Sequence, residues 1–589
     1  MRSRFKNPKV WRLLPHDPAA IRTLAVAAAV SPIVAQLLLN RKISDPQLAK
    51  KFLGCPLSDL HEPELLPGLD AAIDRILAAI RRGDRICIYG DYDVDGVTGT
   101  AILATCLKHL GVEVDYHIPH RVEEGYGLSS DTLRKLAASG IRMVVTVDCG
   151  IASLAEAVVA RELGLELVVT DHHEPKATLP CADVLVHPRL PIGAATYPFD
   201  GLCGAGVAFK LAWGLAKKHC GGAKVSPALR EFLLDAIVLA AMGTVADVVP
   251  LFDENRVLVR HGLVRMRKQP TRGLQSLLRF AKLDEKSSFV AMDIGYSLAP
   301  RINAAGRLGT ARMAVELLMT HSTERADIIA DQLERHNSER QEMERRMLGE
   351  ARAIAAASAI PAAFVLAHRN WHPGLLGIVA SRLVDEYARP TLMISLSNDA
   401  LAQGSGRSIP GFALHEALQE CTEHLVSHGG HAVAAGFRLL PDGLDRFRER
   451  FCEVARRQLG EAPPRGELTI DAEVPFSSLT SNLMLTLEQM EPFGSGNPAP
   501  VLLADDLRVV GEPRCVGKTE GHLSFKVRQQ SKDIKAIGFN LADRVGELMS
   551  QEGRCCLVYT PRLNEWNGFK SIEIVVKDFQ PGPKATLGG

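Results

Sequence analysis

Three aspartates alternate in the segment Gly90–Gly96 (GDYDVDG), which follows an apolar, β-rich run and precedes a region of helical spacing. In an extended chain, this alternation places Asp91, Asp93 and Asp95 on one side. Three carboxylates held so closely repel one another unless a cation neutralises their charge. An EF-hand calcium loop is excluded because Ile102 stands at its twelfth position, where a glutamate is required. The segment therefore predicts a metal site, and an aspartate-rich surface loop is the alternative.

Further carboxylates and two histidines follow other apolar runs of the same region. Asp148 ends the apolar run in VTVDCG, Asp171 ends that in VTDHHEP, and His172 and His173 come directly after Asp171. A single histidine is usually structural, but two behind an aspartate are harder to dismiss. Asp247, in MGTVADVVPL, also follows an apolar run and is interpreted as a fourth aspartate at a strand end. Oxygen and imidazole ligands without a thiolate favour Mg²⁺ or Mn²⁺, and there are enough for two ions and an in-line attack on phosphorus.

The elements that must position these residues alternate between strand and helix. Arg85–Tyr89, Met143–Val147 and Leu165–Thr170 are predicted strands, and Thr98–Leu110 and Ile151–Leu163 are predicted helices. This order indicates a mainly parallel sheet with helices on both faces. Ligands bind at the carboxyl ends of such strands, where the aspartates fall. The glycines Gly204–Gly206 lack the serine of a nucleophile elbow, and no Ser–His–Asp arrangement competes with the metal interpretation.

The remaining pattern predicts an α/β protein with two α/β lobes, a long helix between them and a β-barrel after them. Mixed charges without proline indicate the helix, and a coiled-coil arm is the alternative, although no heptad is sustained. Short strands and a hairpin turn at Trp566–Phe569 favour an OB-fold barrel after the linker Pro463–Gly466. The expected divisions are a helical lead-in at 1–65, a catalytic domain at 66–310, a connecting helix at 311–358, a second α/β domain at 359–462 and the barrel at 467–580.

Composition bounds the function. The 589 residues predict three or four domains, and 69 basic against 68 acidic residues argue against a protein that coats nucleic acid by bulk charge. Twelve cysteines without a Cys-x-x-Cys pair indicate reduced thiols. The apolar stretch Leu24–Leu39 is short for a membrane span, and Ser31 and Pro32 interrupt it as a helix start. We therefore expect a soluble, cytoplasmic protein with no membrane partner.

The four acidic motifs resemble, in order and spacing, those of the DHH phosphoesterase superfamily. The resemblance continues through SLAPRINAAGRLG (297–309), GSGRS (404–408), GGHAVAAGF (429–437) and EPFGSGNPAP (491–500). Within the superfamily, nearly the full chain is similar to bacterial exonucleases that degrade single-stranded DNA from the 5′ end. The resemblance implies a DHH domain, a DHH-associated domain and an OB-fold. It also implies a set of metal ligands for two Mn²⁺ or Mg²⁺ ions, namely Asp91, Asp93, Asp95, Asp148, His172 and Asp247.

The resemblance also implies contacts to DNA. Asp171 and His173 would shape the metal site or contact phosphate, and His173 is counted among the catalytic residues. The expected DNA contacts on the first lobe are Arg301, Asn303 and Arg307, whose alternative role is helix capping with surface charge. Those on the second lobe are Ser405, Arg407 and His431, in glycine-rich motifs that let the backbone approach an anion. That lobe would grip the 5′-terminal nucleotide across a cleft from the metals.

Two weaker signals bear on DNA binding. Arg256–Lys282 holds eight basic residues and no acidic one, which predicts either steering of single-stranded DNA or a solvated basic face. Aromatic and basic residues mix along the barrel strands, a combination that OB-folds use to stack bases. These residues are Phe525, Tyr559, Trp566, Phe569, Arg514, Lys518, Lys526 and Arg528. Some of the aromatic residues must also form the barrel core.

The expected function is a single-strand-specific 5′→3′ DNA exonuclease with a two-metal mechanism, acting in recombination and repair. Its expected partners are single-stranded DNA, a single-stranded-DNA-binding protein and a RecQ-type helicase, and it is expected to be a monomer. One rival is a DHH enzyme for short oligoribonucleotides, cyclic dinucleotides or pyrophosphate, against which the barrel counts. The other is a non-catalytic scaffold, against which the retained carboxylates count.

Overall fold

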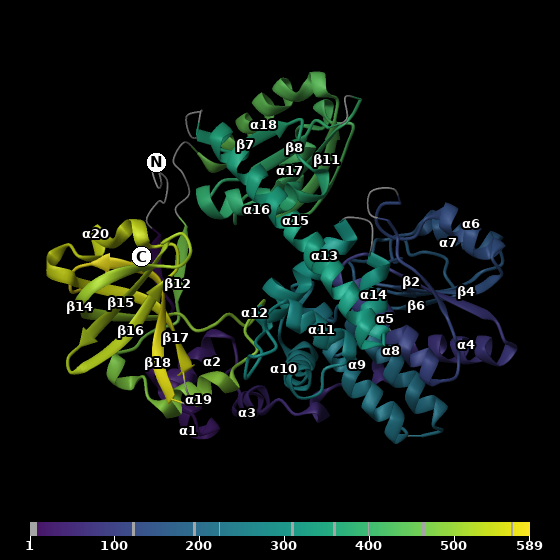
Figure 1. Ribbon diagram of the computed structural model, residues 1–589, viewed down its shortest axis with the longest axis horizontal. Helices are drawn as coiled ribbons and strands as arrows, with labels where there is room; N and C mark the ends of the chain where they lie inside the picture. The colour runs from purple at the N-terminus through teal and green to yellow at the C-terminus, as the bar shows by residue number, and fades with distance from the viewer. Residues whose placement is uncertain are drawn as a thin grey trace. The chain divides into compact units, whose positions relative to one another are not determined.

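The computed structural model describes residues 9–120, 124–191, 196–222, 224–307, 311–356, 361–397, 400–460, 466–566 and 569–588 (Figure 1). These form two compact units. The first is here called the catalytic unit, because it contains the acidic motifs from which the sequence predicts catalysis, and it comprises Ala19–Asn337 and Leu485–Ala499. The second comprises Met1–Pro18, Ser338–Met484 and Pro500–Gly589. The predicted linker residues 463–465 and the turn residues 567–568 lie outside the described residues.

The catalytic unit is built on a parallel sheet of five strands in the order β3-β2-β4-β5-β6. The three predicted strands are confirmed to within two residues, and two short strands were not predicted. The strands are β2 (Arg85–Gly90), β3 (Asp115–His117), β4 (Ile141–Val147), β5 (Glu166–Thr170) and β6 (Val184–Val186). Strand order reverses between β2 and β4, which opens a crevice at their carboxyl ends. The GDYDVDG segment and Asp148 follow these two strands.

Helices cover both faces of this sheet (Figure 1). One face packs against α4 (Leu69–Arg82), α5 (Val94–His109), α8 (Gly204–His219) and α9 (Pro227–Ala246). The other face packs against α6 (Ser130–Ala138) and α7 (Leu154–Glu162). Helix α5 is buried on nearly all sides, because it lies between the sheet and the layer of α8 and α9. That burial explains its apolar sequence, which lacks a polar face.

Further helices complete the catalytic unit. They are α1 (Pro18–Ala28), α2 (Pro32–Asn40), α3 (Pro46–Gly54), α10 (Asp253–Lys268), α11 (Arg272–Phe280), α12 (Ala291–Asp293), a π-helical turn (Ile294–Leu298), α13 (Ala299–Arg307) and α14 (Ala311–Met319). The Ser31 hydroxyl accepts a hydrogen bond from Val34 N at the start of α2, as the sequence predicts. No single described helix is long and apolar enough to cross a membrane; α1 and α2, bent by 108°, pass that test only as a pair.

The connecting helix predicted over 311–358 is wrong as one element. The structure has α14 and a separate helix α15 (Thr323–Ala356) of 34 residues, and the boundary between the two units falls inside α15. The break lies at Thr320–Ser322, where the Thr320 hydroxyl accepts from Ser322 N and the Ser322 hydroxyl accepts from Arg325 N. Side-chain oxygens here replace helical partners of the backbone, so the chain stops and restarts.

The second unit contains a mixed five-stranded sheet in the order β10-β11-β9-β8-β7. Its strands are β7 (Phe364–His368), β8 (Thr391–Ser395), β9 (Ala402–Arg407), β10 (Ser427–Gly430) and β11 (Ala434–Leu439). Helix α16 (Leu376–Tyr387) and the end of α15 share one apolar core with this sheet, and α17 (Leu414–Gln419) and α18 (Leu444–Leu459) share another. This is the second α/β domain that the sequence predicts.

The C-terminal strands close into a barrel. Its strands are β14 (Leu502–Val516), β15 (His522–Gln529), β16 (Lys532–Gly538), β17 (Arg554–Trp566) and β18 (Phe569–Pro581), preceded by β13 (Ala472–Glu473). The order β14-β15-β16-β18-β17 closes through a β14–β17 pairing, which is the connectivity of an OB-fold. Trp566 pairs with Phe569, so the predicted hairpin is confirmed.

Two expectations about the second unit need correction. The lead-in is not wholly helical, because β1 (Val10–Leu13) pairs with β12 (Glu467–Ile470). The buried Trp11 fixes this pair by donating from its indole nitrogen to Asp578 at 2.9 Å. Phe525 and Tyr559 are core residues of the barrel, 5% and 0% exposed, so they do not stack on DNA. The side chains of Trp566 and Phe569 lie outside the described residues.

Candidate metal centre

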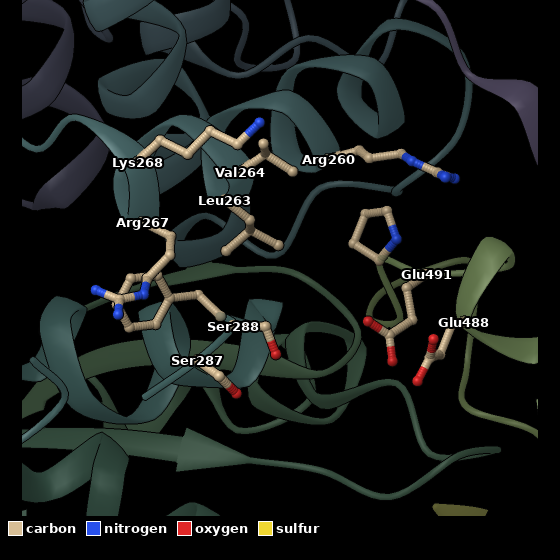
Figure 2. A pocket seen from close by; sticks show the side chains of 11 residues that line it. Arg260, Leu263, Val264, Arg267, Lys268, Ser287, Ser288, Glu488 and Glu491 are labelled. Atoms are coloured by element: carbon tan, nitrogen blue, oxygen red, sulfur yellow. The ribbon is translucent and has the colours of Figure 1, made fainter. Parts of the chain in front are cut away.

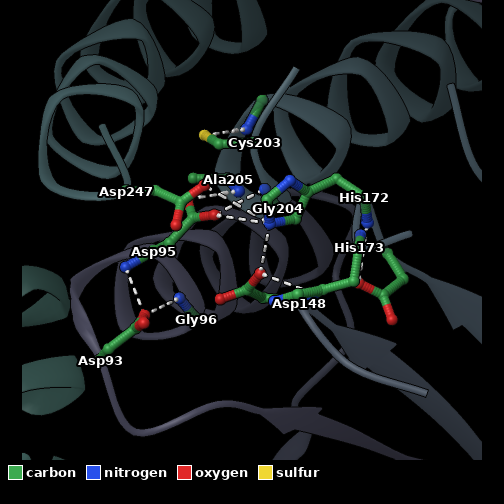
Figure 3. A network of polar contacts seen from close by, with 12 residues as sticks. Asp93, Asp95, Gly96, Asp148, His172, His173, Cys203, Gly204, Ala205 and Asp247 are labelled. Atoms are coloured by element: carbon green, nitrogen blue, oxygen red, sulfur yellow. Dashed lines mark hydrogen bonds and ion pairs between the residues drawn. The ribbon is translucent and has the colours of Figure 1, made fainter. Parts of the chain in front are cut away.

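The GDYDVDG segment is a helix start, which corrects the expectation of an extended chain. Helix α5 begins at Val94, and its N-cap Asp93 accepts hydrogen bonds from Asp95 N at 2.9 Å and Gly96 N at 3.2 Å. The turn directs the aspartates to different neighbours. Atoms of Asp91 and Asp93 gather with Asp148. Asp95 instead gathers with His172 and Asp247 (Figure 3). The alternating motif thus contributes to two adjoining groups of candidate ligands instead of one row.

Asp95 lies at the N-terminus of α8. Its carboxylate accepts hydrogen bonds from Gly204 N at 2.6 Å and Ala205 N at 2.8 Å (Figure 3). The free amides and the helix dipole stabilise a negative charge there, although the side chain is only 1% exposed. Sequence analysis dismissed this glycine-rich segment because it lacks a nucleophilic serine. Its function is to hold a carboxylate, and the signal was a pair of small residues before an apolar helix.

Glycines make room for the carboxylates. A Cβ atom at Gly204 would lie 2.5 Å from Cβ of Asp148 and 2.7 Å from its Oδ1. A Cβ atom at Gly243 in α9 would lie 2.4 Å from Oδ1 of Asp95. Both distances are too short for any side chain, so α8 and α9 approach the acidic residues as closely as they do only because these positions are glycine.

Asp148 occupies the centre of the cluster. It follows β4 in the left-handed region, with φ of 65°, which is costly for a residue other than glycine. Its Oδ1 lies 3.1 Å from Nε2 of His172, and the same histidine atom lies 3.5 Å from Asp247 and 3.8 Å from Asp95. His172 therefore connects the two groups of carboxylates. Backbone strain of this kind is typical of a functional residue.

Asp171 and His173 form a pair beside His172. The Asp171 carboxylate accepts from Ile151 N, from His172 N and from Nδ1 of His173 at 2.8 Å. Burial alone would raise the pKa of Asp171, but these hydrogen bonds, that of His173 first, lower it to about 2. Burial opposes the charge on His173, yet its contact with Asp171 raises its pKa to about 8. Asp171 thus supports the two histidines through its hydrogen bonds.

Asp247 does not end a strand, which corrects the sequence prediction. The apolar run before it is the last part of the 20-residue helix α9, and Asp247 is the residue at its C-terminal end. Helix α9 packs against α5 and α8, and its end lies at the same edge of the sheet as the strand-end carboxylates. A buried helix and a buried strand have equally apolar sequences, so the pattern alone did not distinguish them.

The cluster concentrates negative charge in a buried site, and this raises the pKa values of several of its carboxylates. Burial, followed by repulsion from Asp95 and Asp93, raises the pKa of Asp247 to about 8. The same causes raise the pKa of Asp148 well above its ordinary value, and burial with Asp95 raises that of Asp93. Burial lowers the pKa of His172, which keeps its imidazole neutral. Carboxylates destabilised by one another and a neutral imidazole are what a divalent cation needs as ligands.

Buried atoms without partners support the same conclusion. Among the described residues, Oδ1 of Asp148 and Nε2 of His172 are buried and make no hydrogen bond. Such atoms are costly unless a ligand satisfies them. Three overlapping groups could hold a metal: Asp91, Asp93 and Asp148; Asp95, His172 and Asp247; Asp148, His172 and His173. Oxygen donors alone, or with one or two imidazoles, and no thiolate among them, fit Mn²⁺ or Mg²⁺.

Tyr126 is a site residue that sequence analysis missed. Its side chain is 52% exposed, and its hydroxyl donates to the Asp148 carbonyl at 3.1 Å. The same hydroxyl lies 3.1 Å from Nδ1 of His173. Gly125 and Gly127, both with positive φ, flank the tyrosine, and this Gly-Tyr-Gly pattern was the available signal. Tyr126 therefore borders the cluster from a loop that carries no acidic motif.

The predicted DNA contacts Arg301, Asn303 and Arg307 all lie on helix α13. Oδ1 of Asn303 accepts from Val94 N at 3.2 Å, so Asn303 holds the start of α5. Arg301 forms an ion pair with Glu334 at 2.5 Å and donates to the Ser297 carbonyl. A Cβ atom at Gly306 would lie 2.4 Å from the Tyr92 carbonyl, which explains the close packing of α13 on the GDYDVDG turn. Arg307 is the last described residue of α13. A role of these residues in DNA binding stays a prediction.

Ser405, Arg407 and His431 belong to the second unit. Ser405 and Arg407 lie on the same side of β9, and Nη1 of Arg407 lies 3.3 Å from the Ser405 hydroxyl. His431 is exposed in the turn between β10 and β11, where its N donates to Ala434, the residue paired with Arg407. The structure therefore places the three close together on one sheet.

The glycines of GSGRS have a different function from the predicted one. A Cβ atom at Gly404 would lie 2.1 Å from the Phe437 ring, and one at Gly406 would lie 2.4 Å from Leu392. Both positions face the core, so they serve packing and not the approach of an anion. The side of β9 that is available to an anion carries the serine and the arginine instead.

The basic segment 256–282 is largely used within the fold. Arg256 is buried and donates to three backbone carbonyls, and Arg265 pairs with Asp235 and Glu231. Arg279 pairs with Asp327. Arg267 and Lys268 are exposed and line a pocket of about 290 Å³ with Arg260, Leu263, Val264, Ser287, Ser288, Phe289, Glu488, Glu491 and Pro492 (Figure 2). This pocket shares no residue with the acidic cluster, so it is not the candidate metal site.

Comparison with known proteins identifies the family. Three family models match: the DHH family N-terminal domain at residues 85–241, the DHHA1 domain at 358–457 and the RecJ OB domain at 470–578. Over 575 residues the chain is 37% identical to the single-stranded-DNA-specific exonuclease RecJ of Bacillus subtilis, covering 96% of this chain and 70% of that protein. The chain belongs to the RecJ family.

Solved structures of the RecJ family agree with this assignment. RecJ from Thermus thermophilus in complex with Mn²⁺ has a TM-score of 0.81 at 32% identity, covering 98% of this chain and 80% of that one. Its complex with Mg²⁺ has a TM-score of 0.75 at 31% identity, with coverage of 98% and 79%. The fold predicted from sequence, two α/β domains and an OB-fold, is confirmed. Membership of the RecJ family also confirms the prediction of a metal-dependent exonuclease.

Proposed function

We propose that this chain hydrolyses single-stranded DNA from its 5′ end and acts in recombination and repair. The observation that supports this most is the convergence of three carboxylate and histidine groups at the switch point of a parallel sheet, in a chain that belongs to the RecJ family. The cofactor is Mn²⁺ or Mg²⁺, which the Thermus relatives bind and the donor atoms here fit. We propose two ions, because the ligands form two adjoining groups.

Each group of ligands has a defined support. Asp91, Asp93 and Asp148 would hold one ion, and Asp95, His172 and Asp247 the other. When bound, the ions neutralise the carboxylates and stabilise charge on the phosphodiester as it is cleaved. Asp95 is fixed by the amides of α8, and Asp93 by its own N-cap hydrogen bonds. The chain therefore holds its ligands in place before substrate arrives.

Other residues would contact the substrate. With Nδ1 of His173 donating to Asp171, Nε2 is its atom for a contact with phosphate or a leaving oxygen. Arg407 offers a planar fork that suits two phosphate oxygens, and Ser405 and His431 lie near it. We propose these three, with Arg301, Asn303 and Arg307, as the phosphate contacts. Because Arg301 is paired with Glu334, DNA would have to compete for it.

The domains and partners follow from this proposal. We propose the catalytic domain at 66–310 and the DHH-associated domain at 359–462, with the OB-fold at 467–580 binding single strands. We also propose that the protein is a monomer in the cytoplasm. Its proposed partners are a single-stranded-DNA-binding protein and a RecQ-type helicase. The exposed Phe539, in a ring contact with His522, is one place where the barrel could stack a base.

Digestion of end-labelled DNA tests the proposal. We expect 5′-labelled single strands to release label first, duplex DNA to resist, and EDTA to abolish cleavage that Mn²⁺ or Mg²⁺ restores. Release from the 3′ end would contradict the polarity. A preference for dinucleotides over long single strands would favour the rival DHH enzymes, and no cleavage with either metal would favour a scaffold.

A further inference from the structure

The segment Glu491–Ala499 (EPFGSGNPA) folds with the catalytic unit, although it follows the second α/β domain in the sequence. Nothing in the proposed chemistry uses it. It lies against the residues that come directly after the ligand Asp247, namely 248–252. We call Glu491–Ala499 the glycine strap and residues 248–252 the ligand loop.

The glycine strap contacts the ligand loop through its backbone. Leu251 N donates to the Ser495 carbonyl at 2.8 Å. A Cβ atom at Gly494 would lie 2.7 Å from Cδ1 of Leu251, and one at Gly496, where φ is +72°, would lie 3.0 Å from the Phe252 ring. The glycines are therefore required because the two segments approach so closely.

One buried side chain fixes the shape of the strap. Asn497 is 0% exposed, and its Nδ2 donates to the carbonyls of Met490 at 2.9 Å and Pro492 at 2.8 Å. Its Oδ1 accepts from Nε of Arg41 at 2.7 Å, and its carbonyl accepts from Gly494 N. Arg256 donates to the carbonyl of Met490 from α10. The strap is thus held on both sides by buried hydrogen bonds.

Asn255 connects the ligand loop to the other ligands. Its side chain is 0% exposed, and Nδ2 donates to the carbonyls of Pro250 at 3.0 Å and Gly201 at 2.6 Å. Gly201 precedes by three residues the amide of Gly204, which holds Asp95. Hydrogen bonds, joined by short stretches of backbone, therefore connect Asn497 through the strap and the ligand loop to the segment that precedes α8.

We propose that the glycine strap positions Asp247 against Asp95 and thereby sets the affinity of the centre for a divalent cation, with Asn497 as its main positioning residue. The inference rests on the metal centre of the proposed function. Residues that orient metal ligands typically change affinity by 10- to 100-fold when they are altered. A segment remote in sequence, and without any ligand of its own, would then control metal loading.

The test measures Mn²⁺ binding by calorimetry on the full chain without DNA. In Asn497→Ala we expect Mn²⁺ to bind about tenfold more weakly. We also expect kcat to fall at limiting Mn²⁺ and to recover at high Mn²⁺, with KM for single-stranded DNA unchanged. Gln489→Ala, an exposed change next to the strap, should behave as wild type. Leu133→Ala, in the core on the far face of the sheet, should lower Tm without changing Mn²⁺ affinity.

A second variant keeps the test decisive if Asn497→Ala fails to fold. Gly494→Ala adds one methyl group against Leu251, and it should weaken Mn²⁺ binding in the same direction. Unchanged Mn²⁺ affinity in both folded variants would overturn the inference. The inference would also fail if Leu133→Ala, with a Tm equal to that of the strap variants, lost as much Mn²⁺ affinity as they do. If the wild-type chain itself binds no Mn²⁺, the proposed function fails instead of the strap.

Discussion

Charged residues are buried and held by the backbone at the acidic centre, whereas they are exposed on the barrel surface. At the centre, carboxylates are buried and fixed by backbone amides, as Asp95 is by Gly204 and Ala205. On the barrel, charged residues are exposed and pair with one another, as Arg528 does with Asp533. Chemistry on a phosphodiester requires fixed geometry, whereas binding of a flexible strand does not. A substitution at the centre should therefore lower kcat, whereas a substitution on the barrel should lower the affinity for single-stranded DNA.

The largest expected effect is that of Asp148→Asn. Both groups that include Asp148 lose a charged ligand, so we expect kcat to fall by roughly 10³-fold or more. Without metal, the same change removes repulsion among buried carboxylates, so Tm in EDTA should stay equal or rise. DNA cleavage assays and thermal unfolding in EDTA measure the two effects. Retained cleavage together with a large loss of Tm would give Asp148 a structural role only.

A smaller effect is expected from Gly204→Ala. The added Cβ would lie 2.7 Å from Oδ1 of Asp148, so the carboxylate must move, and a shift of about 1 Å costs about 10²-fold in rate. The matched control is Gly349→Ala on α15, where the Cβ meets no atom within 4 Å. That control should keep full activity and gain up to about 1 kcal/mol in stability. Equal kcat in the two variants would show that the centre tolerates movement.

On the barrel, Phe539→Ala should change affinity and leave chemistry intact. Stacking of a base is worth about 1–3 kcal/mol, so we expect Kd for single-stranded DNA to rise roughly 5- to 150-fold. The value of kcat should be unchanged. Fluorescence anisotropy with labelled oligonucleotides measures Kd, and Met549→Ala removes exposed apolar surface without an aromatic ring as a control. A fall in kcat with unchanged Kd would remove the contrast between the two regions.

The residues of the acidic cluster were easier to predict from the sequence than the contacts that support them. Asp93, Asp148 and His172 were found because residue type and spacing are visible in one dimension. The hydrogen bonds from the α8 amides to Asp95 and the contacts of Tyr126 were missed. Backbone amides and contacts between distant segments produce little recognisable pattern in the sequence. Asp247 lies in the acidic cluster, but the sequence analysis placed it on a strand, since buried helices and strands are equally apolar.

The same limit applies to the fold. Strands β2, β4 and β5 were predicted because each is a β-branched run bounded by polar residues. Short edge strands such as β3 and the pairing of β1 with β12 were not, because few residues and distant partners give no local signal. The break before α15 was visible as polar residues at 320–322, which compete with helical hydrogen bonds, but the charged pattern around it concealed it.

The smallest effect is expected at Glu491, which tests whether burial alone raises the pKa of a carboxylate as it is raised in the acidic centre. Glu491 is a carboxylate outside every candidate metal group of the described residues, and burial, then Glu488, raises its pKa to about 7. The pKa of Glu491 in the folded protein lies above its unfolded value of 4.5. The protonated side chain therefore makes its full contribution to the free energy of unfolding below pH 4.5, and this contribution is lost as the pH rises towards 7.

Glu491→Gln should therefore match wild type near pH 4.5 and exceed it by about 1–2 kcal/mol above pH 7, a value reduced because the side chain is partly exposed. Chemical denaturation at pH 4.5, 6 and 8 in EDTA and in Mn²⁺ measures the difference. If Mn²⁺ leaves this difference unchanged, burial without a cation accounts for Glu491. If Mn²⁺ abolishes it, the region that depends on metal extends beyond the acidic cluster and includes the glycine strap.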